Sequence, residues 1–269
     1  MATSLSSNLL IIINLLIFLL SIPILSTGID LSLHGATNCD KFLQTPLILI
    51  GILLLASSLV GFVGVSSRNA FLLWVYLFTT YVLILAALIF SVFAFVVTNK
   101  GAGEAVSGAR FYEYKLGDYS NWLQNRVSNP KNWVKIKSCL QDTKVCKSLQ
   151  QANSTKDEFF NKHLTSIQSG CCKPPIECGF TYQNATVWDK PSSFSASNQD
   201  CNTWQNNGSV LCYDCQSCKA GVVDYLKTHW KKVATINIIF IALLIIVYTI
   251  GCHAFRRART ERFFDRYRI

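Results

Sequence analysis

The residues with the clearest chemical potential in this chain are its cysteines. Eleven occur in 269 residues, and nine of them fall between Thr98 and Lys232. Three lie at CxxC spacing, as Cys212-x-x-Cys215-x-x-Cys218, a pattern that suits a zinc site, a redox-active pair or structural disulfides. Such zinc sites draw on a second CxxC or on paired histidines, and the four histidines show no such spacing. A thioredoxin-like centre needs a βαβ context that is missing here, so we predict structural disulfides.

The remaining thiols fit the same interpretation. Cys39 lies upstream of the cysteine-rich segment, and adding it to the nine gives ten thiols, enough for five disulfides. The candidates are Cys39, Cys139, Cys146, Cys171, Cys172, Cys178, Cys201, Cys212, Cys215 and Cys218. Cys252 remains alone at the end of the last apolar run. It is a candidate for S-palmitoylation, with an inert buried thiol as the alternative.

No other reactive constellation is indicated. The chain has no recognisable nucleophile–base pair, paired acid–base carboxylates or phosphate-binding loop, and Gly101-x-Gly103 is interpreted as a linker. The net charge of +10 is divided between a mild, scattered excess in residues 98–232 and a basic C-terminal end. We therefore predict no catalytic, cofactor-binding or metal site, no enzyme activity and no nucleic-acid partner.

Four apolar runs surround the cysteine-rich segment, at residues 9–25, 46–65, 70–97 and 233–254. None contains Asp, Glu, Lys or Arg, and a helix of roughly 20 apolar residues crosses a bilayer core. The sequence predicts an all-α membrane protein with a four-transmembrane-helix bundle. A cleaved signal peptide is the alternative for the first run, but residues 1–8 lack the basic charge typical of such peptides.

The distribution of positive charge orients these spans. Six arginines and only two acidic residues follow the last run, which is typical of a cytoplasmic tail. We predict a multi-pass protein of the plasma membrane with both termini in the cytoplasm. The connecting segments are then a cytoplasmic N-terminus (1–8), a small extracellular loop (26–45), a cytoplasmic loop (66–69), a large extracellular loop (98–232) and a cytoplasmic tail (255–269).

Glycosylation sequons agree with this topology. Asn153, Asn184 and Asn207 each begin an Asn-x-Ser/Thr motif, and all three lie in the large loop. Because glycan is added in the secretory lumen, their confinement to one loop favours an extracellular position for it.

The large loop is predicted to be partly helical. Apolar residues recur at spacings of four and three between Tyr112 and Val127, which is typical of one helix face. A second helix would place Trp133, Ile136 and Leu140 together, and Thr155 with Glu158 fits a capping box. Residues 171–218 lack periodicity, so that they need disulfides to hold them. Helical spacing returns at Val222 and continues into the last span.

Polar and small residues interrupt the spans at a few positions. Asn14 and Asn237 are expected to form hydrogen bonds between helices. Span two carries Gly51, Ser58, Gly61 and Gly64, which suit either packing inside the bundle or an interface with a partner, and internal packing is favoured.

A family resemblance follows from these motifs. Gly170-Cys171-Cys172-Lys173-Pro174, Cys39, Cys215-x-x-Cys218 and the four-span plan are similar to those of plant-type tetraspanins over the full length of the chain. The resemblance implies a bundle capped by a disulfide-rich, partly helical extracellular head on a helical stalk. It also implies that Cys171 and Cys172 pair downstream, with Cys178, Cys201, Cys212, Cys215 and Cys218 as candidates. Unlike many animal members, the chain has no acidic residue in its third span.

The resemblance also implies a function. Members of this family organise other membrane proteins laterally into microdomains, form oligomers with one another, and act in cell communication, development and vesicle traffic. We therefore expect a non-enzymatic organiser with other membrane proteins and membrane lipids as its partners. The alternative is a four-span receptor that binds a ligand or a sterol between its charge-free spans.

Overall fold

The computed structural model describes residues 2–34, 38–67, 69–151, 154–191 and 198–267, and the side chains of residues 2–6, 34, 38–43, 46 and 261–267 lie outside the description. The chain divides into two compact units. We call Met1–Val92 with Ala234–Ile269 the membrane unit, and Phe93–Val233 the head.

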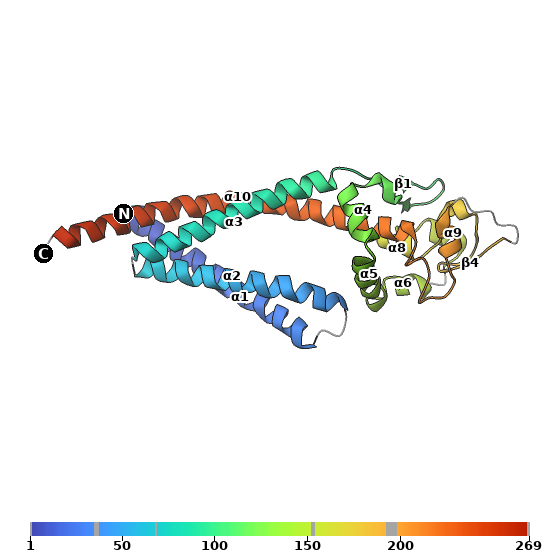
Figure 1. Cartoon of the computed structure of the whole chain (residues 1–269), viewed down its shortest axis with the longest axis horizontal. Coiled ribbons are helices and arrows are strands. Elements are labelled where there is room, and N and C mark those ends of the chain that lie inside the picture. Colours follow the sequence, from blue (N-terminus) through green and yellow to red (C-terminus); the bar gives the residue numbers. More distant parts are fainter. Residues whose placement is uncertain (1, 35–37, 68, 152–153, 192–197, 268–269) are drawn as a thin grey trace. The chain divides into compact units, whose positions relative to one another are not determined.

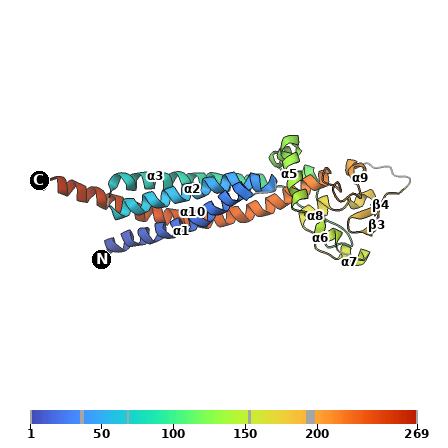
Figure 2. The same cartoon turned by 90° about the horizontal axis from the view of Figure 1, so that it is seen from below.

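Long helices form the membrane unit (Figures 1 and 2). They are α1 (Ala2–His34), α2 (Asn38–Ser66), α3 (Ala70–Thr98) and α10 (Gln216–Tyr267). Within the described residues, these four are long and apolar enough to cross a membrane, which confirms the predicted fold class. α1 and α2 extend well into residues 26–45, so helix occupies most of the segment predicted as a small loop. The first turn of α1 and the last turns of α10 lie at the same end of this unit.

Small residues of span two allow close packing within the membrane unit. A β-carbon at Gly61 would lie 2.5 Å from Oδ1 of Asn14, and one at Gly51 would lie 3.0 Å from Cα of Leu25. Both contacts join α2 to α1, so the stripe serves internal packing, in agreement with the favoured interpretation.

The two asparagines of the spans behave differently. Asn237 on α10 donates from Nδ2 to the carbonyl oxygen of Ala87 (3.0 Å) and to Oγ of Ser91 (2.9 Å), both on α3. This is the predicted hydrogen bond between helices. Asn14 instead donates to Leu10 of its own helix at 2.8 Å, while its buried Oδ1 accepts no hydrogen bond from a described residue. The Asn14 side chain also interacts with that of Tyr76 on α3, so a contact between helices is present here too, and the expected hydrogen bond for Asn14 stays a prediction.

Replacing Asn237 by leucine is expected to destabilise the membrane unit by about 0.6–2 kcal/mol, the usual range for a hydrogen bond between spans. Thr249→Val is the matched control, because among the described residues the Thr249 hydroxyl bonds to Ile246 of its own helix and to no other helix. Unfolding of the full chain in mixed micelles, followed by circular dichroism, measures both changes. An equal loss in the two variants would contradict the assignment.

The head is built from short elements. In chain order they are β1 (Glu104–Ala105), β2 (Tyr112–Glu113), η1 (Leu116–Asp118), α4 (Asn121–Ser128), α5 (Pro130–Asp142), α6 (Lys147–Gln150), α7 (Lys156–Phe160), α8 (Ser166–Cys171), η2 (Ile176–Cys178), β3 (Thr181–Asn184), β4 (Val187–Asp189) and α9 (Gln199–Thr203). β1 pairs antiparallel with β2, and β3 pairs antiparallel with β4. α10 begins in the head as one unbroken helix, as predicted from Val222 onward.

The single helix predicted from Tyr112 to Val127 is wrong. Tyr112 belongs to β2, a short 3-10 turn follows, and an α-helix begins only at Asn121. Gly117 lies inside this stretch and disfavours a continuous helix. The apolar residues still point inward, since Tyr119, Leu123 and Val127 are buried, but they come from different elements.

Capping boxes define the middle of the head. Thr155 and Glu158 bond reciprocally at the start of α7, which confirms the predicted helix start. That helix ends at Phe160, and a second box formed by Thr165 and Gln168 starts α8.

Between these helices and the β3–β4 hairpin lies a cluster of aromatic rings at centroid distances of 5.2–6.5 Å, made of Phe111, Phe159, Phe160, Tyr182 and Trp188.

Candidate functional site: the Cys-Cys segment and its pocket

The candidate site is centred on residues 170–174, here called the Cys-Cys segment, which ends α8. Its glycine is required by close contact between two backbones. A β-carbon at Gly170 would overlap the carbonyl oxygen of Ser217 in the first turn of α10. A β-carbon at Gly221 would likewise overlap the carbonyl oxygen of Ser166. The two helices therefore touch through their backbones, and only glycine fits at these two crossings.

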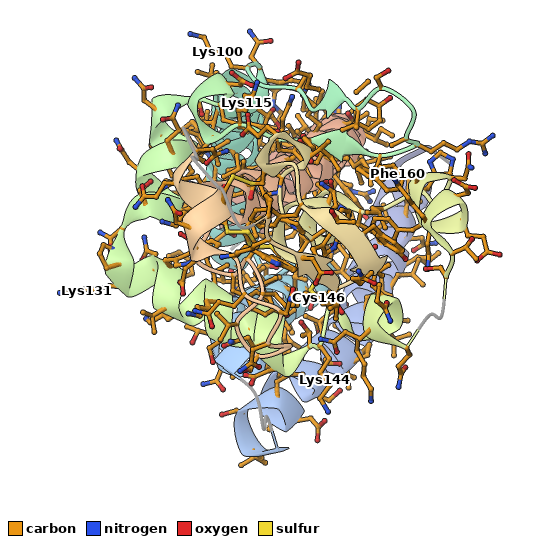
Figure 3. The ribbon with its side chains drawn as sticks, turned by 90° about the vertical axis from the view of Figure 1, so that its right-hand side faces the viewer. Lys100, Lys115, Lys131, Lys144, Cys146 and Phe160 are labelled. Carbon is orange, nitrogen blue, oxygen red and sulfur yellow. A yellow bond between two sulfur atoms is a disulfide. The ribbon has the colours of Figure 1, made fainter. Side chains whose placement is uncertain are left out.

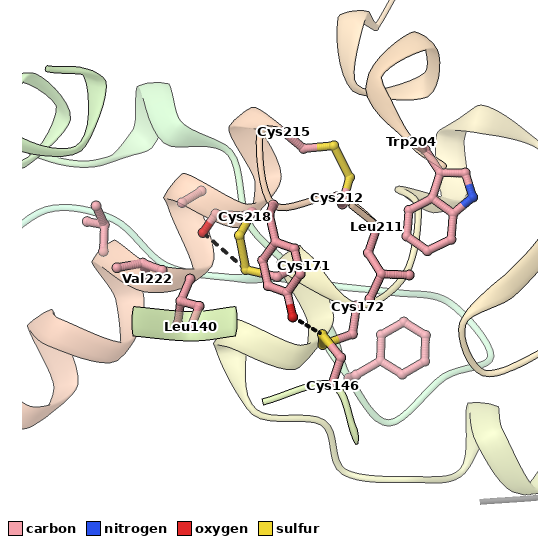
Figure 4. Close-up of a cluster of buried hydrophobic side chains, with 14 of the residues drawn as sticks. Leu140, Cys146, Cys171, Cys172, Trp204, Leu211, Cys212, Cys215, Cys218 and Val222 are labelled. Atoms are coloured by element: carbon pink, nitrogen blue, oxygen red, sulfur yellow. Dashed lines mark hydrogen bonds between the residues drawn. A yellow bond between two sulfur atoms is a disulfide. The ribbon is translucent and has the colours of Figure 1, made fainter. Parts of the chain in front are cut away.

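Two disulfides extend from the segment in opposite directions (Figure 4). Cys171 bonds to Cys218, which fastens α8 to α10. Cys172 bonds to Cys146, the residue that precedes α6. The expectation that both cysteines pair downstream is correct for Cys171 and wrong for Cys172. Neighbouring residues of a helix point about 100° apart, so Cys171 and Cys172 face different elements.

Two further disulfides close the remainder of the head. Cys178 bonds to Cys201 and thereby holds α9, and Cys212 bonds to Cys215. All three thiols of the CxxCxxC pattern are therefore oxidised in this structure, as the structural interpretation requires. Cys139 is also disulfide-bonded, and the side chain of Cys39 lies outside the described residues. Cys252 is the free thiol among the cysteines that are described.

Lys173 is the most unusual residue of the segment, because its side chain is only 1% exposed. Its Nζ pairs with Oε1 of Glu113 on β2, donates to the carbonyl oxygen of Pro174 at 3.2 Å, and lies 4.8 Å from the Phe111 ring centroid. Burial lowers the pKa of Lys173, and the charge and hydrogen bond of Glu113 oppose that shift. The same Oε1 also accepts from the backbone N–H of Ile176 at 2.9 Å. One carboxylate thus joins β2 to Lys173 of the Cys-Cys segment and to the first residue of η2.

A second buried carboxylate fixes the start of α10. Asp200, on α9, accepts from the backbone N–H of Gln216 at 2.7 Å and from that of Ser217 at 2.8 Å. A carboxylate at a helix N-terminus satisfies free N–H groups and interacts favourably with the helix dipole. The disulfide between Cys178 and Cys201 holds this carboxylate in place.

A third carboxylate, in the third turn of α10, joins this helix to two other segments of the head. Asp224 accepts from the Tyr119 hydroxyl at 3.1 Å and from the Ser166 hydroxyl at 2.8 Å. Burial raises the pKa of Tyr119, and the charge of Asp224 raises it further, so the phenol stays a hydrogen-bond donor.

The first two of these carboxylates, Glu113 and Asp200, line a pocket of about 380 Å³ in the head. It lies among β1, β2, the end of α8, η2 and the start of α10. Its charged lining consists of four acidic side chains and one basic side chain, Glu104, Glu113, Glu177, Asp200 and Lys115. Residues 98–232 carry 17 basic and 11 acidic residues, so this acidic pocket belongs to a segment whose net charge is positive. Glu104 and Glu177 are its exposed acids.

The modification candidates lie apart from this pocket. Asn207 is exposed, and its Oδ1 accepts from the N–H and the hydroxyl of Ser209. Asn184 is half-buried at the end of β3. Asn153 lies outside the described residues.

Sequence reasoning found the cysteines and Lys173 but missed Glu113, Asp200 and Asp224. Each of these carboxylates bonds to residues at least 15 positions away, and no local pattern marks them. The unusual combination of a lysine between a cysteine pair and a proline pair was a signal that its charge requires a buried partner.

Comparison with known proteins gives a consistent result over the whole chain. The family model described as "Tetraspanin family" matches residues 6–254. Tetraspanin-8 of Arabidopsis thaliana is 53% identical over 263 residues, which cover 97% of this chain and 96% of that protein. Tetraspanin-7 of the same plant is 50% identical, with 94% and 97% covered. Protein TORNADO 2, also from Arabidopsis thaliana, is 42% identical, with 98% of each chain covered.

Proposed function

This chain belongs to the tetraspanin family, and from that premise we propose that it binds other membrane proteins laterally and assembles them into microdomains. In this proposal the chain acts as a non-enzymatic organiser, and its partners include further tetraspanins, as homo- or hetero-oligomers. Roles in cell–cell communication, development or vesicle traffic are the consequences that we expect.

The acidic pocket beside the Cys-Cys segment is the observation that carries this proposal. Disulfides, glycine contacts and buried carboxylates hold its walls rigidly, and a preorganised surface loses little entropy on binding. Its charge complements a basic segment of a partner protein, because Glu104 and Glu177 are exposed at a site with a single lysine. We therefore place the primary contact with partner proteins at this pocket.

Charge reversal at the pocket tests the proposal. The full chain carrying Glu104→Lys and Glu177→Lys would be purified from native membranes in mild detergent, and the membrane proteins that accompany it would be quantified. Asp157→Lys with Asp189→Lys is the matched control, because both residues are exposed acids of the head outside the pocket lining.

We expect a defined set of partners to fall about tenfold or more with the pocket variant, since like charges brought together at an interface cost several kcal/mol. The control should keep that set. If both variants retain the same partners in the same amounts, the pocket does not bind partner proteins.

The topology and modifications remain part of this proposal. We place both termini in the cytoplasm, the head outside the cell, and the protein in the plasma membrane, which agrees with α1 beginning and α10 ending at the same end of the membrane unit. Asn153, Asn184 and Asn207 are the proposed glycan sites, and Cys252 is the proposed acylation site. Glycosidase digestion and acyl exchange of single-residue variants would test these assignments.

Binding of a lipid such as a sterol is a second candidate function, and one observation favours it. A pocket of about 130 Å³ in the membrane unit lies between α1 and α2 and is lined by Asn14, Leu15, Phe18, Ser58, Leu59 and Phe62. The Asn14 side chain lines this pocket and lies close to Tyr76, and its buried Oδ1 accepts no hydrogen bond from a described residue. A buried acceptor without a donor is costly, and a hydroxyl group would satisfy it.

Sterol retained after purification from sterol-containing membranes tests this candidate. The native chain should retain sterol above the level of the Asn14→Leu variant, which fills similar space without an acceptor. Equal, background-level retention in both proteins would dispose of it.

A further inference from the structure

A cluster of aromatic rings lies at the base of the head. The Trp122 ring on α4 contacts Phe93 on α3 at a centroid distance of 5.2 Å and Trp230 on α10 at 6.0 Å. Phe93 and Trp230 also contact each other, at 6.3 Å. α3 and α10 are two of the spanning helices, and tryptophan at the ends of spans favours the level of the lipid headgroups. Trp122 packs on both of these rings, so the same preference for headgroups applies to the start of α4.

The exposed side of α4 pairs this aromatic anchor with a cation. Leu123 and Val127 are buried in the head, whereas Trp122 and Arg126, four residues apart, are exposed. The Arg126 guanidinium carbon lies 4.9 Å from the Trp122 ring centroid. A guanidinium held on an indole keeps its N–H groups free to bind a phosphate group.

α5 continues the pattern. Trp133 and Leu140 are buried, and the opposite side presents Lys131, Val134 and Lys135, with Val134 66% exposed. Figure 3 shows Lys131 extending away from the head at its margin. Neither lysine forms an ion pair with a described residue, and Arg126 forms none either.

This helical pair is strongly basic. Residues 121–142 contain four basic residues and a single acidic one, and Lys137 alone among the four basic residues has an ion-pair partner, Asp214 at 2.5 Å. The other three basic groups flank exposed tryptophan and valine, a combination typical of helices that lie in a membrane interface.

We propose that the exposed side of α4 and α5, formed by Trp122, Arg126, Lys131, Val134 and Lys135, binds the phosphate groups of lipids in the leaflet from which the head emerges. Trp122 inserts among the headgroups, and the three cations contact phosphate. A membrane is the partner of choice because Trp122 packs on Phe93 and Trp230, which belong to two of the helices long and apolar enough to cross a membrane. Binding here would hold the head against the bilayer, and it is independent of which proteins the acidic pocket recognises.

Lipid competition on the full chain tests this inference. The chain would be reconstituted in phosphatidylcholine vesicles with brominated phosphatidylglycerol or brominated phosphatidylcholine, and quenching of tryptophan fluorescence gives the relative binding constant. The test variant carries Arg126→Gln, Lys131→Gln and Lys135→Gln. The matched control carries Lys144→Gln, Lys147→Gln and Lys162→Gln, three exposed cations elsewhere on the head. Trp74, at the other end of α3, contributes equally in all three proteins.

We expect the relative binding constant for the anionic lipid to be at least about fivefold higher in the native chain and in the control than in the test variant. Each cation near a membrane surface contributes appreciably to lipid binding. Equal preference in the test variant and the control would overturn the inference. An unchanged lipid preference combined with loss of co-purified proteins in the test variant would also overturn it, since the surface would then bind protein.

Discussion

Replacing both Cys171 and Cys218 by serine is expected to lower the free energy of unfolding of the head by about 4 kcal/mol. The disulfide closes a loop with a sequence separation of 47, and the loss of chain entropy in the unfolded state grows with loop length. The backbones of α8 and α10 already touch at Gly170. The native structure of the variant should therefore be unchanged, but it would lack the covalent link between the two helices. Pulse proteolysis of the full chain in urea measures this loss.

Cys212→Ser with Cys215→Ser is the matched control for this experiment. That disulfide has a sequence separation of only three, so its removal should cost about 1.5 kcal/mol. Both variants remove one disulfide from the same region of the head. Equal losses would contradict the view that the Cys171–Cys218 disulfide is the main fastening of α8 to the stalk helix α10.

Removal of the charge on Glu113 is expected to have an effect of similar size. Glu113→Gln leaves the ammonium group of Lys173 buried without its counter-ion, which typically costs about 3–5 kcal/mol. Adding Lys173→Met to this variant should recover most of the loss, because apolar side chains often replace a buried ion pair at little cost. The same proteolysis measurement applies.

The exposed pair of Lys115 and Glu104 supplies the control. Its atoms are 3.0 Å apart, but the side chains are 64% and 72% exposed, so Glu104→Gln should leave the free energy of unfolding almost unchanged. A loss in Glu113→Gln no greater than in Glu104→Gln would show that the buried pair does not hold β2 to the Cys-Cys segment.

The stability of the Glu113→Gln variant should depend on pH with a defined sign. Burial lowers the folded-state pKa of Lys173 below its ordinary value of 10.5. At pH values between the folded-state pKa and 10.5, the unfolded chain therefore binds more protons than the folded chain. The stability contribution of Lys173 therefore rises with pH through that window. Without Glu113, which raises this pKa, the window widens toward lower pH, and part of the lost stability should return on alkalinisation.

Local signals predicted those parts of the fold that are determined locally. The start of α7 follows from the reciprocal bonds of Thr155 and Glu158, and α5 follows from the spacing of Trp133, Ile136 and Leu140. The spans follow from uninterrupted apolar runs, although the helices extend beyond the runs because polar residues at span ends are also compatible with helix. The helix predicted from the spacing of apolar residues between Tyr112 and Val127 failed at its start. Tyr112 and Glu113 form a strand that pairs with β1, and Glu113 also pairs with Lys173.

The candidate site shows the same division. Cysteine number and placement indicated a disulfide-tied head, but the partner of Cys172 depends on which side of α8 faces α6, a property of tertiary packing. The caps and ion pairs made by Asp200 and Glu113 join segments far apart in sequence. Their residue types are common, so only the folded structure distinguishes them from surface carboxylates.

We propose that the head selects the partner proteins of this tetraspanin. Proximity labelling in native membranes tests it most directly, with a labelling enzyme fused after Ile269 and with residues 171–218 exchanged for the corresponding segment of a related tetraspanin. We predict that the labelled membrane proteins change to those of the tetraspanin that donated the segment. The exchanged head would first be shown to be folded and oxidised. If the labelled membrane proteins are then still those of the native chain, the head does not select the partners, and partner selection belongs to the spans.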